Sequence, residues 1–273
     1  MRALSRHLAV ILLLSLAAAA QAPQLKEAEF QSKSMGRAMH YRVYVPASYA
    51  QGEKRYPVLY LLHGLYGNQK DWSDRTEIKS YLDGADLIVV MPDANDSWYV
   101  NWDTDPKQRY EDYIIKDLVA EIESNYRIDV KRESRFIAGL SMGGYGALKF
   151  GLKYPQMFSF AGSFSGALNA PTRLEDQEQN FANQLDKAFG AKDSKTRADN
   201  DILRLIKVAD VNAIPYLYLD CGSDDFLLQA NRDFVAVLPG LHVRYQYQER
   251  PGKHEWPFWD RSIRQFLPLL QAH

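Results

Sequence analysis

The fold is decided by the stretch Arg135-Phe136-Ile137-Ala138-Gly139-Leu140-Ser141-Met142-Gly143-Gly144. Its first half is an apolar run typical of a buried strand, and residues 145–150 open a helical pattern. Ser141 therefore lies at a sharp junction between a strand and a helix, with Gly139 and Gly143 two residues to either side. Small residues at those places let the strand and the helix pass closely. The pattern favours a nucleophile elbow over an ordinary tight turn that carries a serine.

Strand and helix patterns alternate along the rest of the chain. Continuous apolar runs at 57–62 and 87–91 are typical of strands buried on both faces, and residues 39–46 alternate like a half-exposed strand. The alternation predicts an α/β fold with a mostly parallel sheet covered by helices on both faces. Its catalytic groups are expected at the carboxyl ends of the strands. The remaining predicted strands are 158–163, 216–221 and 243–247, and the predicted helices are 113–126, 148–152, 231–238 and 256–269.

A serine nucleophile needs two partners, a histidine that takes its proton and a carboxylate that orients the histidine. In α/β folds with such an elbow, the acid and then the histidine follow the serine in the chain. His242, His254 and His273 come after Ser141. His254 lies in a loop between the last predicted strand and the last predicted helix, so we expect it to be the base. A plain surface-loop histidine is the alternative.

Two adjacent carboxylates compete for the orienting role. The predicted strand 216–221 ends in Gly222-Ser223-Asp224-Asp225. One of the two aspartates is suited to cap the helix that follows, because a carboxylate accepts from the free N–H groups of a first turn. Asp220 is a weaker candidate, since it lies inside the strand. The residues alone leave Asp224 and Asp225 unseparated.

The oxyanion of an acyl-transfer intermediate needs two backbone N–H donors. The expected donors are Met142, which follows the nucleophile, and Leu65, in the loop that follows the apolar run 57–62. His63 precedes the elbow in the chain, so we expect it to shape this loop by hydrogen bonding rather than to transfer protons.

Two further stretches are candidates for substrate binding. The aromatic residues Trp98, Tyr99 and Trp102 follow a predicted strand end, and Tyr66 lies in the Leu65 loop; all four are predicted to line the substrate pocket. The alternative is that the aromatics cover an edge of the core. Residues 169–212 form a charged insertion with apolar residues at helical spacing, which predicts either a partial lid or an inert covering of two amphipathic helices.

Residues 1–20 resemble a secretory signal peptide. Arg2 and Arg6 precede an apolar run from Leu8 to Ala20 that ends in small residues. The run is shorter than the roughly 20 residues that a membrane-spanning helix needs, so an uncleaved anchor is the weaker alternative. We therefore expect cleavage after Ala20, export to the periplasm or the medium, and no stable membrane insertion afterwards.

Composition points to one domain. Hydrophobic residues make up 46% of the 273 residues and no linker or repeat divides the chain, so residues 21–273 are expected to form a single catalytic domain. The net charge of −1 gives no indication of nucleic-acid binding. Cys221 is the single cysteine, which excludes an internal disulfide.

Four motifs in this order resemble the putative-esterase family of α/β-hydrolases, which includes S-formylglutathione hydrolases, feruloyl and tributyrin esterases and the antigen 85 mycolyltransferases. The motifs are Leu62 to Gly67, Gly139 to Gly146, Cys221 to Asp225 and His254 to Trp259. The resemblance implies an α/β-hydrolase fold and hydrolysis of short-chain acyl, acetyl or feruloyl-type esters, with no metal or organic cofactor.

The resemblance also assigns roles to residues. It places the nucleophile on Ser141, the base on His254 and the oxyanion donors on Leu65 and Met142, and the family's spacing from Gly222 selects Asp225 as the acid. The expected partner is a small-molecule or carbohydrate-linked ester. Acyl transfer to a sugar or lipid alcohol is the alternative reaction, and a non-catalytic carbohydrate-binding relative is the alternative class. This chain lacks the glutamate that antigen 85 proteins carry in the acid region, which argues against mycolyl transfer.

Overall fold

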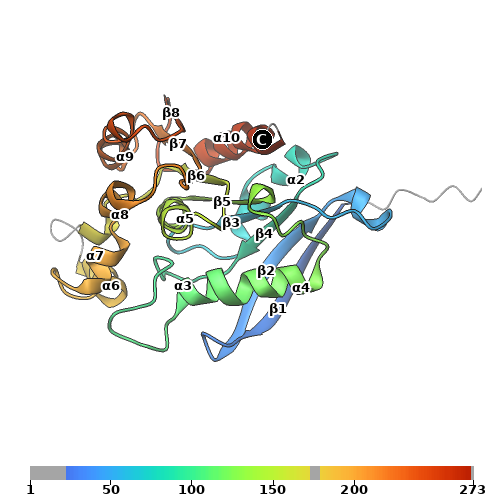
Figure 1. The fold of residues 1–273 in the computed structure, drawn as a ribbon, viewed down its shortest axis with the longest axis horizontal. Helices are drawn as coiled ribbons and strands as arrows, with labels where there is room; N and C mark the ends of the chain where they lie inside the picture. The colour runs from blue at the N-terminus through green and yellow to red at the C-terminus, as the bar shows by residue number, and fades with distance from the viewer. Residues whose placement is uncertain (1–22, 173–178, 272–273) are drawn as a thin grey trace, which may run out of the picture.

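The computed structural model describes residues 23–172 and 179–271. Their centre is a twisted sheet with the strand order β1-β2-β4-β3-β5-β6-β7-β8 (Figure 1). The six strands β4, β3, β5, β6, β7 and β8 are parallel to one another. The hairpin of β1 and β2 joins this sheet through β2, which is antiparallel to β4. The mostly parallel sheet predicted from the sequence is confirmed. The strands are β1 Gln24–Ser32, β2 Arg37–Val45, β3 Val58–Leu62, β4 Ile88–Pro92, β5 Arg135–Leu140, β6 Phe160–Phe164, β7 Tyr216–Gly222 and β8 Tyr245–Arg250.

Helices cover both faces of the sheet, with α3, α4 and α5 on one side and α2 and α10 on the other (Figure 1). The strands show why. Val58, Tyr60 and Leu62 of β3 belong to one buried cluster, whereas Leu59 and Leu61 belong to a second cluster on the opposite face. Because side chains alternate along a strand, a strand buried on both faces must be apolar throughout. The helices are α1 Asp71–Arg75, α2 Ile78–Tyr81, α3 Tyr110–Asp112, α4 Val119–Asn125, α5 Met142–Lys153, α6 Gln179–Phe189, α7 Lys195–Asn200, α8 Ile202–Val208, α9 Leu228–Val235 and α10 Trp256–Phe266, with a π-helical segment Tyr113–Leu118 joining α3 to α4.

Two edges of the sheet differ from the sequence prediction. β1 was not predicted, because charged residues such as Lys26, Glu27 and Glu29 weaken its apolar pattern. β8 lies two to three residues later than the predicted strand 243–247, since His242 adopts a left-handed conformation with φ of 56° before the strand begins. Both are edge strands with a partly exposed face, so burial does not impose a clear apolar pattern on them.

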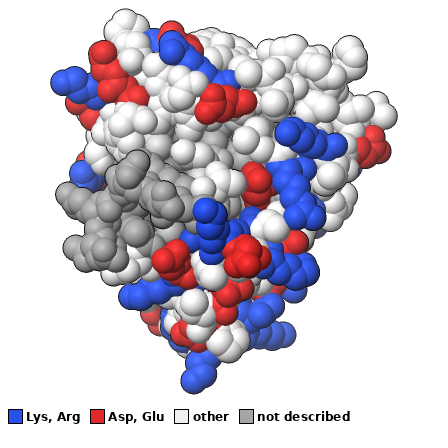
Figure 2. Space-filling model, turned by 90° about the vertical axis from the view of Figure 1, so that its left-hand side faces the viewer, with Lys and Arg blue, Asp and Glu red and all other residues white. Residues whose placement is uncertain are grey.

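The predicted signal peptide, residues 1–20, lies outside the described residues. Within the described ranges, no helix is long and apolar enough to span a membrane. The face of the molecule shown in Figure 2 carries positive and negative side chains intermixed rather than a patch of one sign.

At Gly143, α5 passes close to the end of β3. A Cβ atom at Gly143 would lie 2.6 Å from the carbonyl oxygens of both Leu62 and His63. These obstructions belong to the backbone, so no side-chain movement relieves them. The spacing of glycine around Ser141 is therefore imposed by contact between backbones.

Gly143→Ala is expected to lower the free energy of unfolding by about 1–3 kcal/mol, as overpacked cores do. Helix propensity alone would predict the opposite sign, a gain of about 0.5–1 kcal/mol from alanine. The matched control is Gly240→Ala, where an added Cβ meets nothing within 4 Å. Thermal unfolding of both variants checks the difference, and a Gly143→Ala midpoint equal to that of Gly240→Ala would contradict the backbone constraint.

Candidate active site

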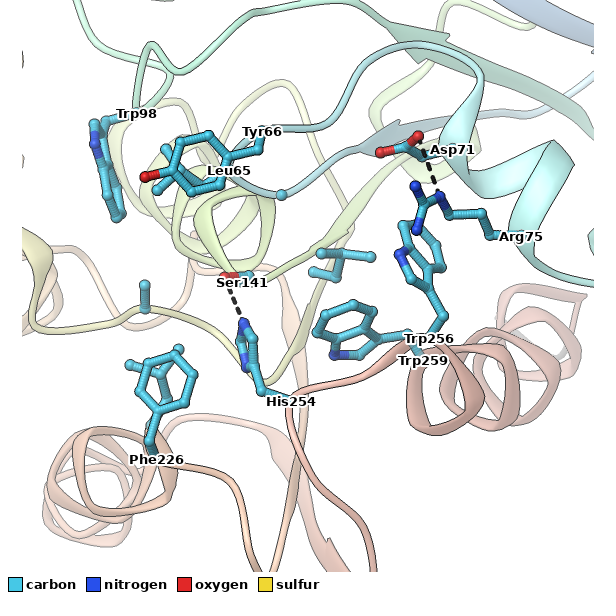
Figure 3. A pocket seen from close by; sticks show the side chains of 14 residues that line it. Leu65, Tyr66, Asp71, Arg75, Trp98, Ser141, Phe226, His254, Trp256 and Trp259 are labelled. Atoms are coloured by element: carbon cyan, nitrogen blue, oxygen red, sulfur yellow. Dashed lines mark hydrogen bonds and ion pairs between the residues drawn. The ribbon is translucent and has the colours of Figure 1, made fainter. Parts of the chain in front are cut away.

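Three loops at the carboxyl ends of the sheet strands bring Ser141, His254 and Asp225 together. The Nε2 atom of His254 lies 2.9 Å from the Oγ atom of Ser141 (Figure 3). The Nδ1 atom of the same ring lies 2.9 Å and 3.1 Å from the two carboxylate oxygens of Asp225. Ser141 comes from the junction of β5 and α5, Asp225 from the loop after β7, and His254 from the loop after β8. A hydroxyl, an imidazole and a carboxylate in this chain of contacts can generate a nucleophile by proton transfer.

The structure separates the two aspartates. Asp225 is buried and accepts a further hydrogen bond from the Leu227 N–H, at 2.9 Å. Asp224 is exposed, and its own N–H donates to the Gly252 carbonyl at 3.0 Å. Burial by itself would raise the pKa of Asp225, but the hydrogen bond and charge of His254 and the Leu227 N–H outweigh it and hold the pKa below its ordinary value. Asp225 is therefore an ionised acceptor at neutral pH.

The backbone around Ser141 is arranged to present its side chain. Ser141 has φ of 52° and ψ of −117°, in a region that side-chain-bearing residues rarely occupy. Its N–H donates to the Phe164 carbonyl at 2.9 Å, and its carbonyl accepts from the Tyr145 and Ala167 N–H groups, both at 3.0 Å. These bonds to β6 and to the following loop hold the turn in place. A strained turn held by its surroundings is typical of functional sites.

The loop after β3 offers the second half of an oxyanion site. The Tyr66 N–H is bound to the Asp96 carboxylate at 2.6 Å, and the Gly67 N–H is bound to the Gly64 carbonyl at 3.1 Å. Leu65 lies between Gly64 and Tyr66, whose backbone groups make these hydrogen bonds, and it lines the same cavity as Ser141. Met142 is the first residue of α5, where backbone N–H groups have no partner within the helix. The Leu65 and Met142 N–H groups are thus the candidate oxyanion donors.

His63 shapes this loop and does not face Ser141. It is fully buried, and its Nε2 atom accepts from the Ala94 N–H at 3.0 Å while Nδ1 lies 2.7 Å from the Gly64 carbonyl, which assigns the proton to Nδ1. Burial lowers the pKa of His63, although the Gly64 carbonyl and the nearby Asp93 oppose the shift. A neutral His63 with both ring nitrogens engaged ties β3 to the loop after β4.

Comparison with known proteins identifies the family. The family profile described as "Putative esterase" matches residues 32–270. An acetyl esterase from Caldicellulosiruptor saccharolyticus is 34% identical over 213 residues, which is 75% of this chain and 79% of that protein. This chain belongs to that esterase family. It is a carboxylic ester hydrolase, and the family expected from the sequence motifs is confirmed.

Solved structures support the same fold. Fluorophosphonate-binding serine hydrolase F from Staphylococcus aureus, solved with substrate bound, has a TM-score of 0.83 and 28% identity, and the match covers 91% of this chain and 98% of that one. A ferulic acid esterase has a TM-score of 0.78 and 28% identity over 92% of this chain and 98% of its own. The enzyme therefore has the α/β-hydrolase fold expected from the sequence.

Ser141 opens into a cavity of about 470 Å³ (Figure 3). Of the four aromatic residues that the sequence predicted for the pocket, Trp98 and Tyr66 line this cavity. On the far side, Phe226 and Trp259 lie on either side of the His254 ring, with ring centroids 4.6 Å and 4.9 Å away. The complete lining is Gly64, Leu65, Tyr66, Asp71, Arg75, Trp98, Leu140, Ser141, Ala167, Phe226, Leu227, His254, Trp256 and Trp259.

The structure corrects the prediction for Tyr99 and Trp102, which do not line the cavity. Tyr99 is fully buried beneath the pocket wall, with its hydroxyl donating to the His63 carbonyl at 2.9 Å. Trp102 donates its indole N–H to the Ser97 carbonyl at 3.1 Å and packs against Tyr110. The sequence placed these aromatics in one stretch, but the tight turn at Trp98 sends their side chains in different directions.

Phe226, Trp256 and Trp259 were missed as lining residues. Phe226 directly follows Asp225, and the two tryptophans follow His254 by two and five residues. Their proximity to the predicted acid and base was the available signal.

Among the described residues, no group of three or more His, Cys, Asp or Glu side chains is placed to hold a metal ion.

The insertion at 169–212 packs behind the pocket. Phe189 of α6 contacts Trp98 and Tyr145, with centroid distances of 6.1 Å and 6.0 Å. No described residue of the insertion lines the cavity. The described part favours the covering alternative over a lid, because Leu185, Phe189, Ile202 and Ile206 are buried, although Val208 is exposed.

Asp225→Asn is expected to lower the turnover of an ester by about 10³ to 10⁴, because an amide no longer fixes the histidine tautomer or stabilises the imidazolium. The neighbouring variant Asp224→Asn is the control and should cost less than about tenfold. Steady-state kinetics with a chromogenic acetate ester measure both. A larger loss in Asp224→Asn would overturn the assignment of the acid.

Proposed function

We propose that the enzyme is an exported serine esterase that hydrolyses carboxylic esters through an acyl-enzyme on Ser141. The observation that carries this proposal is the continuous contact from the Asp225 carboxylate through the His254 ring to the Ser141 hydroxyl. This hydroxyl faces a cavity that is lined mostly by apolar side chains.

Each group has a step in the proposed reaction. As the Ser141 oxygen attacks the ester carbonyl, His254 Nε2 takes the hydroxyl proton, and Asp225 stabilises the imidazolium that forms. The carbonyl oxygen becomes an oxyanion next to the N–H groups of Leu65 and Met142, at the positive end of the α5 dipole. His254 then gives the proton to the leaving alkoxide. Water then loses a proton to His254 as its oxygen attacks the acyl carbonyl. When the bond between the acyl carbon and the Ser141 oxygen breaks, His254 returns the proton to that oxygen, and the acid leaves.

The proposed substrates are short-chain acyl, acetyl or feruloyl-type esters, either small molecules or carbohydrate-linked. Similarity to an acetyl esterase and to a ferulic acid esterase supports this range. The cavity supports it too, since a volume of about 470 Å³ with Trp98 and Trp259 in its walls suits an acetyl group as well as a planar aryl group. Product analysis with an added alcohol acceptor distinguishes hydrolysis from acyl transfer.

Ser141→Ala and His254→Ala should each reduce ester hydrolysis by roughly 10⁴ or more, and the double variant should be little worse than either single one, since the two groups act as a unit. The exposed residues Ser223 and His242 provide matched controls as Ser223→Ala and His242→Ala, which should retain near wild-type turnover. A fluorophosphonate probe should label the wild-type protein and the controls but not Ser141→Ala. Labelling of Ser141→Ala at the wild-type rate would contradict the assignment of the nucleophile.

Export is proposed from the pattern of residues 1–20, with its basic start, apolar run and small residues before the cut. Expression of the full chain in a bacterial host should give a protein outside the cytoplasm that begins at Gln21, within about two residues. Intact-mass measurement of the purified fraction checks this. A substitution that places charges in the apolar run, Leu13→Arg with Leu14→Arg, should keep the protein in the cytoplasm at full length. Retention of an unprocessed wild-type chain would reject export.

A further inference from the structure

We propose that Lys149 is a positioning residue for the substrate pocket: its buried ammonium group holds the Tyr99 carbonyl and so fixes the strained Trp98–Tyr99 turn that forms one wall of the cavity. The inference rests on the proposed function, because it concerns the same pocket. It adds a residue that lies outside both the catalytic chain of contacts and the cavity lining.

The Trp98–Tyr99 turn needs outside support. Trp98 and Tyr99 both have left-handed backbone conformations, with φ of 58° and 55°. Two consecutive large residues in this sparsely occupied region are unfavourable unless surrounding contacts impose the conformation. The backbone N–H of Trp98 donates to the Met142 sulfur at 3.3 Å, and that of Tyr99 donates to the Ser97 hydroxyl at 3.0 Å. The Tyr99 carbonyl accepts from the Lys149 ammonium.

Lys149 is unusual for a lysine because it is completely buried, in the middle of α5. Its second partner is Glu111 of α3, at 2.7 Å. Burial lowers the pKa of Lys149 to about 8, with Glu111 acting against the shift, so the group carries its charge at neutral pH. The Glu111 carboxylate is also bound by Lys153 at 2.7 Å and by the Tyr154 hydroxyl at 2.6 Å. With Glu111 held by these other groups, the Lys149 ammonium is directed at the Tyr99 carbonyl.

The same turn braces the loop after β3. The Tyr99 hydroxyl donates to the His63 carbonyl at 2.9 Å, one residue before the Gly64-Leu65 turn. The Tyr99 ring packs against α5 at Gly146, where an added Cβ would lie 2.7 Å from the ring. Tyr99 thus connects α5, the turn that carries Trp98, and the loop that contains the candidate oxyanion donor Leu65.

A purely structural ion pair is the competing interpretation, and Lys153 provides the control for it. Lys153 lies one turn further along α5 and binds the same carboxylate, but its other hydrogen bond goes to the Asn200 side chain, at 3.3 Å. Lys153→Met therefore removes a cation from Glu111 and leaves the bond to Tyr99 in place.

The test variant is the double substitution Lys149→Met with Glu111→Gln. It removes one positive and one negative charge, so the net charge of the cluster of Lys149, Glu111 and Lys153 is unchanged, whereas either single replacement would change it. Wild type, double variant and Lys153→Met are assayed with two series of esters, in which either the acyl or the alcohol part grows from methyl to phenyl size. The quantity compared is the ratio of kcat/KM for a bulky ester to kcat/KM for the smallest ester of the same series. In the double variant this ratio should fall about tenfold or more in at least one series, mainly because KM for the bulky esters rises. In Lys153→Met the ratio should stay within about twofold.

A folded double variant with the wild-type ratio in both series would overturn the proposal. So would an equal change of the ratio in Lys153→Met. The proposed function fails separately, if the wild-type protein neither hydrolyses any of these esters nor reacts with a fluorophosphonate probe.

Tyr99→Phe keeps the inference testable if the double variant does not fold. It removes only the hydroxyl that reaches the His63 carbonyl, so it should reduce kcat about three- to tenfold with KM nearly unchanged, through looser placement of the oxyanion donors. An unchanged kcat in folded Tyr99→Phe would show that the turn does not brace that loop, and would also overturn the proposal.

Discussion

The close passage of α5 over β5 and β3 is the constraint on which the rest of the structure depends. Gly139 and Gly143 allow it, since a Cβ on either one would lie 2.6 Å from backbone atoms of the neighbouring segment. That passage forces the chain through a left-handed turn at Ser141 and starts α5 immediately afterwards. The hydroxyl of Ser141, the first N–H groups of the helix and the floor of the cavity all follow from this one contact between backbones.

The positions of Asp225 and His254 depend on the pairing of β7 with β8. Gly222 and Arg250 lie opposite each other at the ends of these strands, so the loops that carry Asp225 and His254 leave the sheet side by side. A buried ion pair between Asp220 and Arg250 connects the two strands, and Arg250 also donates to Ser262 of α10 at 3.0 Å. Burial raises the pKa of Asp220 to about 6, although the charge and hydrogen bond of Arg250 oppose the shift.

Buried polar groups organise the site on its other side. Neutral His63 bridges two loops by hydrogen bonds to backbone groups, and charged Lys149 of α5 binds both the Tyr99 carbonyl and the Glu111 carboxylate. Such groups are costly to bury unless their hydrogen bonds are made, so they specify one arrangement of the loops. The insertion adds apolar support from behind, where Phe189 packs on Trp98. The pocket wall that carries Trp98 is therefore supported by His63, Lys149 and Phe189, none of which lines the cavity itself.

The sequence by itself determined the α/β fold, the serine elbow and the histidine after the last strand, because glycine spacing and fully apolar strands are imposed by local sterics and burial. It also indicated the esterase family through motif order. It left Asp224 and Asp225 unseparated on physical grounds, misplaced Tyr99 and Trp102, and missed the edge strand β1. Only the tertiary structure decided those points. Backbone angles within a single turn, together with contacts between segments far apart in the chain, decide which of two adjacent aspartates faces the histidine. They also decide which of several aromatic side chains reaches the cavity. Neither is recorded in the local pattern of residues.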